Sequence, residues 1–156
     1  MSKGEVNTPI AIAETDEEIS ACFAVMTELR PQVARETFVA RVRQQMSGGY
    51  KLAYLSDDGA VAACAGFRVF DTLPWGRVLY VDDLVTAERS RSRGFGARMM
   101  EWLLEYARRE KCQELHLDSG TWRTDAHRFY FREGMVVKSF HFSREVGGEG
   151  GSLVES

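Results

Sequence analysis

The chain has 156 residues, of which 44% are hydrophobic and 28% are charged, and its formal net charge is -3 at pH 7. This net acidity excludes a protein whose whole surface is built to bind nucleic acid. We expect one domain over residues 1–145, large enough to bury most of its apolar side chains, followed by a flexible glycine-rich tail over 146–156.

The three cysteines indicate the compartment. Cys22, Cys64 and Cys112 are widely spaced within apolar stretches and show no CxxC spacing. This pattern is typical of reduced core residues rather than of a disulfide framework or a metal site. The sequence shows no signal-peptide core and no run of roughly 20 apolar residues. We therefore expect a cytoplasmic protein that binds neither a membrane nor nucleic acid.

In the first half of the chain, the pattern predicts a strand, two helices and a hairpin. The strand begins at Ile10, and a helix with Thr15 or Asp16 as its N-cap runs to about Arg30, before Pro31. A second amphipathic helix covers 35–46. Two strands, over 50–56 and 60–70, flank Asp57-Asp58-Gly59, which is a hairpin signature because Asp and Gly accept positive φ.

The second half alternates strands with helices. Strands are predicted over 77–87, 114–118 and 135–145, with helices over 97–110 and 125–134. The hairpin favours antiparallel pairing, whereas the later helical connections favour parallel pairing. The sequence therefore predicts an α/β domain with a mixed sheet.

The most informative stretch is AERSRSRGFGARMM, residues 87–100, which lies between a predicted strand and a predicted helix. A helix N-terminus binds anions, Gly94 and Gly96 let a phosphate approach the main chain, and Arg91 and Arg93 add charge-assisted bonds. Its spacing fits neither the GxxxxGK[ST] loop of nucleoside triphosphatases nor the GxGxxG dinucleotide motif, because Met99 stands at the third glycine. We expect a di- or polyphosphate ligand.

The spacing RxxGxG, from Arg91 to Gly96, resembles the acetyl-coenzyme A loop of the GCN5-related N-acetyltransferase (GNAT) superfamily. A second family element appears in order and at the right separation as AHRFYFREGM, residues 126–135. The resemblance implies a mixed, mostly antiparallel sheet of six to seven strands, with splayed central strands and about four flanking helices. The C-terminal sequence, AHRFYFREG followed by SFHFSRE, also looks like that of aminoalkylphosphonate acetyltransferases.

The resemblance further implies acetyl-coenzyme A as the acyl donor and assigns residues to it. Backbone groups of the strand before the loop would bind the pantetheine arm, and the loop would bind the pyrophosphate. Arg123 stands where the family often has asparagine, so it would contact either a phosphate or an anionic acceptor. His127 is either a cofactor contact or an ordinary interface residue. The full set is Leu84, Val85, Thr86, Arg91, Ser92, Arg93, Gly94, Phe95, Gly96, Ala97, Arg123, His127 and Tyr130.

The implied reaction is direct attack of an amine on the thioester, which requires a base for the ammonium proton. Asp82 or Asp118 is the expected base, directly or through water, although either carboxylate can instead be a strand-end group satisfied by amides. Strand alternation predicts that Asp82 and Asp83 face opposite ways. Tyr130 matches the family's general acid, or it packs as an ordinary helix residue. His116 and His141 lack ligand spacing, so no metal is expected.

The resemblance implies that the acceptor enters opposite the cofactor, between the first two helices and the loops after the fifth strand. The candidates there are Glu28, Arg30, Phe70, Tyr80 and Trp122. This mixture suits a small amine that also carries an acidic group, such as an amino acid or an aminophosphonate. A peptide N-terminus as acceptor, a non-catalytic acyl-coenzyme A module, an RNA-binding arginine segment and a plain helix-entry turn all remain open alternatives. The assembly state is left open: the resemblance implies that dimers are frequent, and the edge of the last predicted strand is where a homodimer could form.

Overall fold

The computed structural model describes residues 9–147, which form two compact units divided after Leu117. Each unit is described by itself. In chain order the elements are β1 (Ile10–Ile12), α1 (Asp16–Ala21), α2 (Phe23–Leu29), α3 (Arg35–Ser47), β2 (Lys51–Asp57), β3 (Ala60–Thr72), β4 (Gly76–Thr86), the 3₁₀ turn η1 (Glu88–Ser90), α4 (Phe95–Arg109), β5 (Glu114–Leu117) and α5 (Thr124–Arg132). The first unit therefore holds the whole sheet and α1 to α4.

The sheet has the order β1-β2-β3-β4-β5. The first four strands pair antiparallel with their neighbours, whereas β5 runs parallel to β4. The predicted mixed, mostly antiparallel α/β class is therefore confirmed.

The element count differs from the prediction, since the described residues form five strands and five α-helices rather than six to seven strands and about four helices. The strand predicted over 135–145 is wrong, because residues 135–147 have no regular structure. This segment has a strand-like apolar pattern, but no strand among residues 9–147 pairs with it. A β-strand exists only where a neighbour satisfies its backbone groups.

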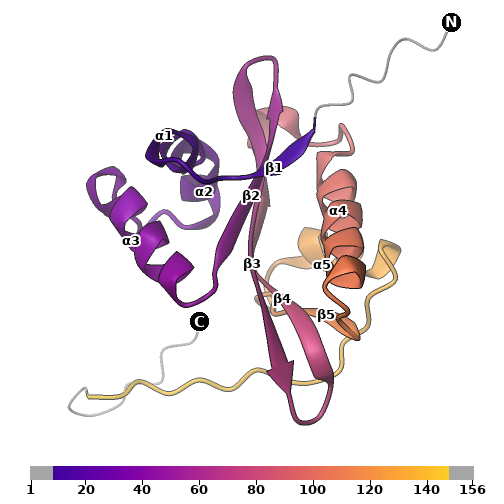
Figure 1. Cartoon of the computed structure of the whole chain (residues 1–156). Coiled ribbons are helices and arrows are strands. Elements are labelled where there is room, and N and C mark those ends of the chain that lie inside the picture. Colours follow the sequence, from indigo (N-terminus) through magenta and orange to yellow (C-terminus); the bar gives the residue numbers. More distant parts are fainter. Residues whose placement is uncertain (1–8, 148–156) are drawn as a thin grey trace, which may run out of the picture. The chain divides into compact units, whose positions relative to one another are not determined.

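Two hydrophobic cores lie on the two faces of the sheet. Helices α1, α2 and α3 cover one face and α4 covers the other (Figure 1). On the first face Phe23 meets Phe38 edge to face, with ring centroids 5.2 Å apart. On the second face Met99 and Leu103 of α4 are fully buried in the same core as Phe67. Strand β4, along which the candidate site lies, contributes Val85 to the first core and Leu79 and Val81 to the second.

Local signals explain the first helix and the hairpin. Thr15 is the N-cap of α1 and forms a capping box with Glu18, so it and not Asp16 begins the helix. The predicted helix to about Arg30 is divided at Cys22 into α1 and α2. At the hairpin, Asp58 and Gly59 both adopt positive φ, at 52° and 78°, as two-residue turns require.

A β-bulge interrupts the pairing of β3 with β4. Gly66 pairs with Asp83 and the next β3 residue, Phe67, pairs with Val81, so Asp82 is an extra residue with no partner in the register. The bulge changes which way the neighbouring side chains point, and it places Asp82 where strand alternation alone would not.

The prediction that Asp82 and Asp83 face opposite ways is therefore wrong. The Asp83 carboxylate accepts a hydrogen bond from Tyr50, which belongs to the core beneath α1 to α3. The Asp82 carboxylate is bound by Arg68 of β3. Arg68 lies two residues after Gly66, so the two residues share one face of β3. Gly66 is the residue that pairs with Asp83. Both carboxylates consequently serve one face of the sheet.

Candidate active site

The C-terminal part of β4 has one unpaired edge. Pairing with β5 ends at Val81 and Leu117, whereas pairing with β3 continues to Thr86. Successive residues of a strand direct their backbone N–H and C=O groups to alternate sides. The Ala87 N–H donates to the Ala62 carbonyl, so by alternation Val85 also faces β3. The backbone groups of Leu84 and Thr86 point away from β3 and pair with no strand among residues 9–147, while the Val85 side chain is buried in the core. That these residues bind a ligand through their main chain stays a prediction.

After β4, the chain continues through η1 and a short loop to the N-terminus of α4. After η1, residues 91–94 are exposed, Gly94 adopts a φ of 80° and α4 begins at Phe95. The first helical bond joins the Arg98 N–H to the Gly94 carbonyl at 3.0 Å. The amides of Phe95, Gly96 and Ala97 therefore have no acceptor within the helix, and no side chain caps them. An anion placed there would receive hydrogen bonds and the positive end of the helix dipole.

The loop arginines have separate roles. Arg89 donates to the Val61 carbonyl at 2.9 Å. Arg93 forms an ion pair with Asp57 and lies 5.0 Å from the centre of the Phe95 ring. Within residues 9–147, Arg91 is exposed and forms no ion pair or side-chain hydrogen bond. The positive charge free for a phosphate is therefore concentrated at Arg91. The bare amides and this arginine fit a pyrophosphate.

Two aspartates at the bulge are each held by an arginine. Arg68 binds both carboxylate oxygens of Asp82, each at 3.0 Å. Arg30, the C-cap of α2, donates from Nε to Asp83 Oδ1 at 2.9 Å and from Nη2 to the Asp82 carbonyl at 3.0 Å. Tyr50 donates to the other oxygen of Asp83 at 2.8 Å. Both oxygens of each carboxylate are consequently engaged.

The tyrosine and its glycine neighbour make this arrangement rigid. Tyr50 is 4% exposed, and burial, followed by the negative charge of Asp83, raises the pKa of its hydroxyl. It packs where a side chain on Gly66 would otherwise be, because a Cβ there would overlap the Tyr50 hydroxyl. The phenol therefore stays a neutral hydrogen-bond donor to Asp83.

Aromatic rings flank the outer arginine. The Arg68 guanidinium carbon lies 5.3 Å from the Phe70 ring centre and 5.4 Å from that of Tyr80. The hydrogen bond to Asp82 raises the pKa of Arg68. Arg68 was absent from the predicted site residues, although a single arginine within the apolar strand segment 60–70 is the signal that would have identified it.

The predicted acceptor residues do not all lie together. Phe70 and Tyr80 surround Arg68, and Arg30 reaches the same bulge. Glu28 instead accepts the backbone N–H of Glu88 at 2.8 Å and lines a pocket beside Val61. Along β3 the distance from Val61 to Phe70 is about 30 Å. Glu28 therefore joins α2 to the loop rather than to this aromatic group.

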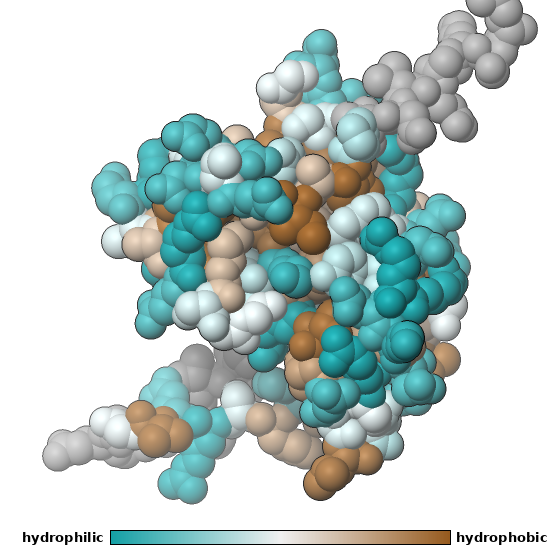
Figure 2. Space-filling view, in the orientation of Figure 1, coloured by the Kyte–Doolittle hydropathy of each residue, from teal (hydrophilic) through white to brown (hydrophobic). Residues whose placement is uncertain are grey.

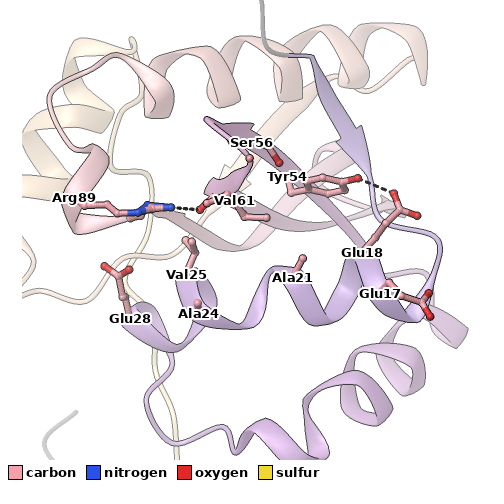
Figure 3. Close-up of a pocket in the computed structure, with 13 residues that line it drawn as sticks. Glu17, Glu18, Ala21, Ala24, Val25, Glu28, Tyr54, Ser56, Val61 and Arg89 are labelled. Carbon is pink, nitrogen blue, oxygen red and sulfur yellow. Dashed lines mark hydrogen bonds between the residues drawn. The ribbon is translucent and has the colours of Figure 1, made fainter.

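The pocket beside Glu28 has a volume of about 550 Å³ and lies between α1, α2 and the β2–β3 hairpin (Figure 3). Two of its three acidic residues, Glu18 and Glu28, have structural partners. The Tyr54 hydroxyl donates to Glu18 at 2.7 Å, and this bond and those from Thr15 lower the pKa of Glu18 to about 2. Since neither bulge aspartate lines the pocket, it is separate from the carboxylate pair.

The second unit carries the remaining predicted residues. Its first residue, Asp118, lies 3.6 Å from the imidazole Nδ1 of His141. The Trp122 ring packs over Gly120, whose carbonyl is 2.8 Å from His127 Nε2. Trp122 is otherwise largely exposed.

Helix α5 aligns three of these predicted residues. Arg123 is its N-cap, and His127 and Tyr130 follow within the helix, three residues apart and so near one face. Burial raises the pKa of the Tyr130 hydroxyl, while the charge of Arg123 acts to lower it. Tyr130 therefore stays protonated at neutral pH and is able to donate a proton.

Two kinds of feature are absent from the described part of the chain. Residues 9–147 contain no group of three or more His, Cys, Asp or Glu side chains that could hold a metal ion. No helix among them is long and apolar enough to span a membrane.

Comparisons with known proteins give related acetyltransferases. The chain is 31% identical over 132 residues to the uncharacterized N-acetyltransferase YhdJ of Bacillus subtilis (strain 168), covering 83% of this chain and 93% of that protein. It is 27% identical over 127 residues to the aminoalkylphosphonate N-acetyltransferase of Salmonella typhimurium (strain LT2), covering 80% of each chain.

A solved structure, of a transcriptional regulator from Bacillus halodurans C-125, superposes with a TM-score of 0.78 at 17% identity, covering 88% of this chain and 99% of that one. This likeness concerns the fold. The model of the acetyltransferase (GNAT) family matches residues 12–135, from β1 through α5. The chain therefore belongs to the GNAT family of acetyltransferases.

Proposed function

We propose that this acyltransferase moves the acetyl group of acetyl-coenzyme A to the primary amine of a small molecule, by direct attack in a ternary complex. The amino acids and aminophosphonates are the proposed acceptor class. One observation carries the proposal: the edge of β4 that is unpaired among residues 9–147 is followed, after η1 and the exposed residues 91–94, by the bare amides at the start of α4. An extended donor with an amide arm and a pyrophosphate matches both features.

In this proposal the chain binds the donor mainly through its backbone. Main-chain groups of Leu84, Val85 and Thr86 bind the pantetheine arm, while those of Arg91 to Ala97 bind the pyrophosphate, with the Arg91 side chain at its rim. Coenzyme A supplies the acetyl group as a thioester. In the second unit, Arg123 and His127 are proposed contacts of the donor or of an anionic acceptor.

The chain must also move two protons. A carboxylate accepts the ammonium proton, and Asp82 and Asp118 are the two candidates. Asp82 is bound by Arg68, whereas Asp118 lies next to His141 at the end of β5. Tyr130, which burial keeps protonated, is the proposed donor to the departing thiolate.

The acceptor class is supported by the bulge and by a relative. Arg68, Phe70 and Tyr80 form an aromatic and cationic group beside carboxylates, which suits an amine that carries an acidic group. The related protein from Salmonella is an aminoalkylphosphonate N-acetyltransferase. Arg30 and, in the second unit, Trp122 complete the proposed acceptor residues.

Thiol release from acetyl-coenzyme A with a panel of amines tests the proposal. Amino acids and aminophosphonates should be acetylated faster than peptides with free N-termini. Tyr130→Phe should lower kcat at least tenfold, roughly the smaller end of proton-transfer contributions, while donor affinity stays unchanged. Asp82→Asn and Asp118→Asn separate the two candidate bases, because only loss of the true base lowers kcat with the amines that carry an acidic group.

Other outcomes would favour the alternatives. Preference for peptides would indicate a protein or peptide acetyltransferase. Donor binding without turnover of any amine, and with no effect of Tyr130→Phe, would indicate an acyl-coenzyme A-binding module.

We also propose that the molecule is a homodimer. Phe140 and Phe142 are 85% and 90% exposed, and Val136, Val137 and Val146 on the same segment are also exposed. Figure 2 shows hydrophobic side chains standing out along this segment. Exposed apolar side chains concentrated in one strand-like stretch favour pairing with a second copy.

Two further proposals concern organisation and location. Residues 1–145 act as one acetyltransferase domain, supported by the span of the family model across the division at Leu117. The predicted tail begins at 146, and residues 148–156 lie outside the described part. A cytoplasmic location is supported by three free cysteines, two of which are buried.

A further inference from the structure

We propose that Arg68 binds the anionic group of the acceptor, and that this exchange of partners frees the Asp82 carboxylate to take the ammonium proton. This rests on the proposed function, because it explains how the same site would choose its amine. It assigns a role to a residue that the sequence pattern did not single out.

Arg68 is positioned as a receptor for a planar or tetrahedral anion. Its guanidinium is held beside the rings of Phe70 and Tyr80 and already binds one carboxylate through two parallel hydrogen bonds. The fork geometry suits carboxylates and phosphonates, which accept two such bonds at once. Its side chain is nevertheless 42% exposed. A second anion can therefore approach without unfolding the strand.

The bulge places Asp82 at the point where the free edge of β4 begins. Val81 is the last β4 residue paired with β5, and Asp82 follows it as the bulged residue. A ligand bound along the free edge from Leu84 to Thr86 would thus have this carboxylate at the adjoining position on the strand. Asp82 is also the more accessible bulge carboxylate, at 24% exposure against 16% for Asp83.

Asp83 is less suited to the same role. Arg30, the C-cap of α2, and the buried Tyr50, just before β2, engage its two oxygens. Releasing it would leave a buried phenol without its acceptor, which is costly in the protein interior. The Asp82 carboxylate is instead held by the half-buried Arg68, which a substrate group can replace there.

The exchange links acceptor recognition to proton transfer. With Arg68 bound to both oxygens, the Asp82 carboxylate already accepts a hydrogen bond at each oxygen and leaves neither open to an incoming ammonium group. An acceptor carboxylate or phosphonate that takes over Arg68 releases both oxygens. The ammonium N–H bond then breaks, an O–H bond forms on Asp82, and the nitrogen keeps the electron pair for attack. An amine that carries no anionic group does not displace Arg68, so both oxygens of Asp82 stay bound to it.

The experiment compares matched amines in thiol-release assays. The pairs are 3-aminopropylphosphonate with propylamine and β-alanine with ethylamine, and the readout is the ratio of kcat/KM within each pair. The variants are Arg68→Met and, as matched control, Arg77→Met. Arg77 is also an arginine of this sheet that pairs with carboxylates, at Asp71 on β3 and at Glu110 after α4.

In the wild type we expect the anionic member of at least one pair to be preferred. In Arg68→Met that preference should fall roughly ten- to hundredfold, the loss expected for hydrogen bonds between charged groups. Arg77→Met should keep it. Arg68→Lys, which retains charge without the fork, should give an intermediate ratio and also serves if the methionine variant fails to fold.

Three results would overturn the inference: no preference in the wild type for either pair, an unchanged ratio in both Arg68 variants, or an equal loss in Arg77→Met. Failure of the proposed function looks different. In that case the wild type neither releases thiol with any amine nor shows a melting shift with acetyl-coenzyme A. If the function holds, Arg68→Met keeps the acetyl-coenzyme A shift while losing discrimination.

Discussion

Gly66 is a glycine because the Tyr50 hydroxyl occupies the space that a side chain there would need. That hydroxyl binds Asp83, which in turn holds Arg30 at the end of α2. One absent side chain thus allows a helix, a buried phenol and the bulged strand to be joined at a single carboxylate.

Replacing Gly66 with alanine should therefore destabilise the fold. The Cβ must displace a tyrosine that is almost fully buried, and overpacking of this kind costs about 1–3 kcal/mol. Urea denaturation measures the change. Gly48→Ala is the matched control, because its Cβ would make an ordinary contact 3.5 Å from the Gln45 carbonyl. Equal effects in the two variants would contradict the close approach.

At the same scale, the sequence predicted some of the candidate site and not the rest. The position of the loop from Arg91 to Gly96 between a strand and a helix could be predicted, because glycine and arginine spacing at such a junction is a local signal. The relative facing of Asp82 and Asp83 was not readable, since a bulge changes it and leaves no mark in a single strand's alternation. The role of Arg68 could not be predicted, because it depends on aromatic rings and a carboxylate that two different strands bring together.

Among the elements, α1 depends on a charge that holds its first turn. Glu18 accepts the backbone N–H of its N-cap Thr15 at 3.0 Å and also the hydroxyl of Tyr54 on β2. The Thr15 hydroxyl in turn accepts the Glu18 N–H at 3.1 Å. The same side chain thus caps the helix and ties it to the sheet.

This arrangement predicts a pH dependence of stability. The pKa of Glu18 falls to about 2 in the folded protein, below its ordinary value of 4.5, so between these values the unfolded chain binds more protons. The stabilisation is complete above about pH 4.5. It is lost as the pH falls toward 2.

Comparing the free energy of unfolding of wild type and Glu18→Gln from pH 6 to pH 2 isolates this contribution. The difference should be largest at the upper end and shrink on acidification, because glutamine keeps an acceptor but not the charge. A difference that stays constant across the range would contradict the role given to the ionised carboxylate.

Most elements could be predicted because their signals are local. The hairpin at Asp58 and Gly59 and the capped start of α1 follow from nearby residues, and the structure confirms both. The predicted strand over 135–145 failed for a different reason. A strand requires a partner, and an alternating pattern shows only that a segment would suit pairing if a neighbouring edge were available.

At the scale of the whole molecule, the exposed segment predicts self-association. Light scattering after size exclusion should give twice the monomer mass for the wild type and the monomer mass for the double variant Phe140→Ser, Phe142→Ser. Leu73→Ser is the control, since Leu73 is fully exposed on the β3–β4 hairpin and does not belong to the segment. A monomeric wild type would refute the proposed homodimer.

The central claim is that the β4 edge and the α4 N-terminus together bind acetyl-coenzyme A. The most direct measurement is the melting temperature of the wild type, Gly96→Val and Thr86→Val with and without acetyl-coenzyme A. Saturation at a hundred times the dissociation constant stabilises a protein by about 2.7 kcal/mol, which corresponds to several degrees for a domain of this size. We predict that shift in the wild type and in Thr86→Val, where the backbone contacts persist, and its loss in Gly96→Val. Absence of a shift in folded, ligand-free wild type, or an equal loss in both variants, would contradict the account.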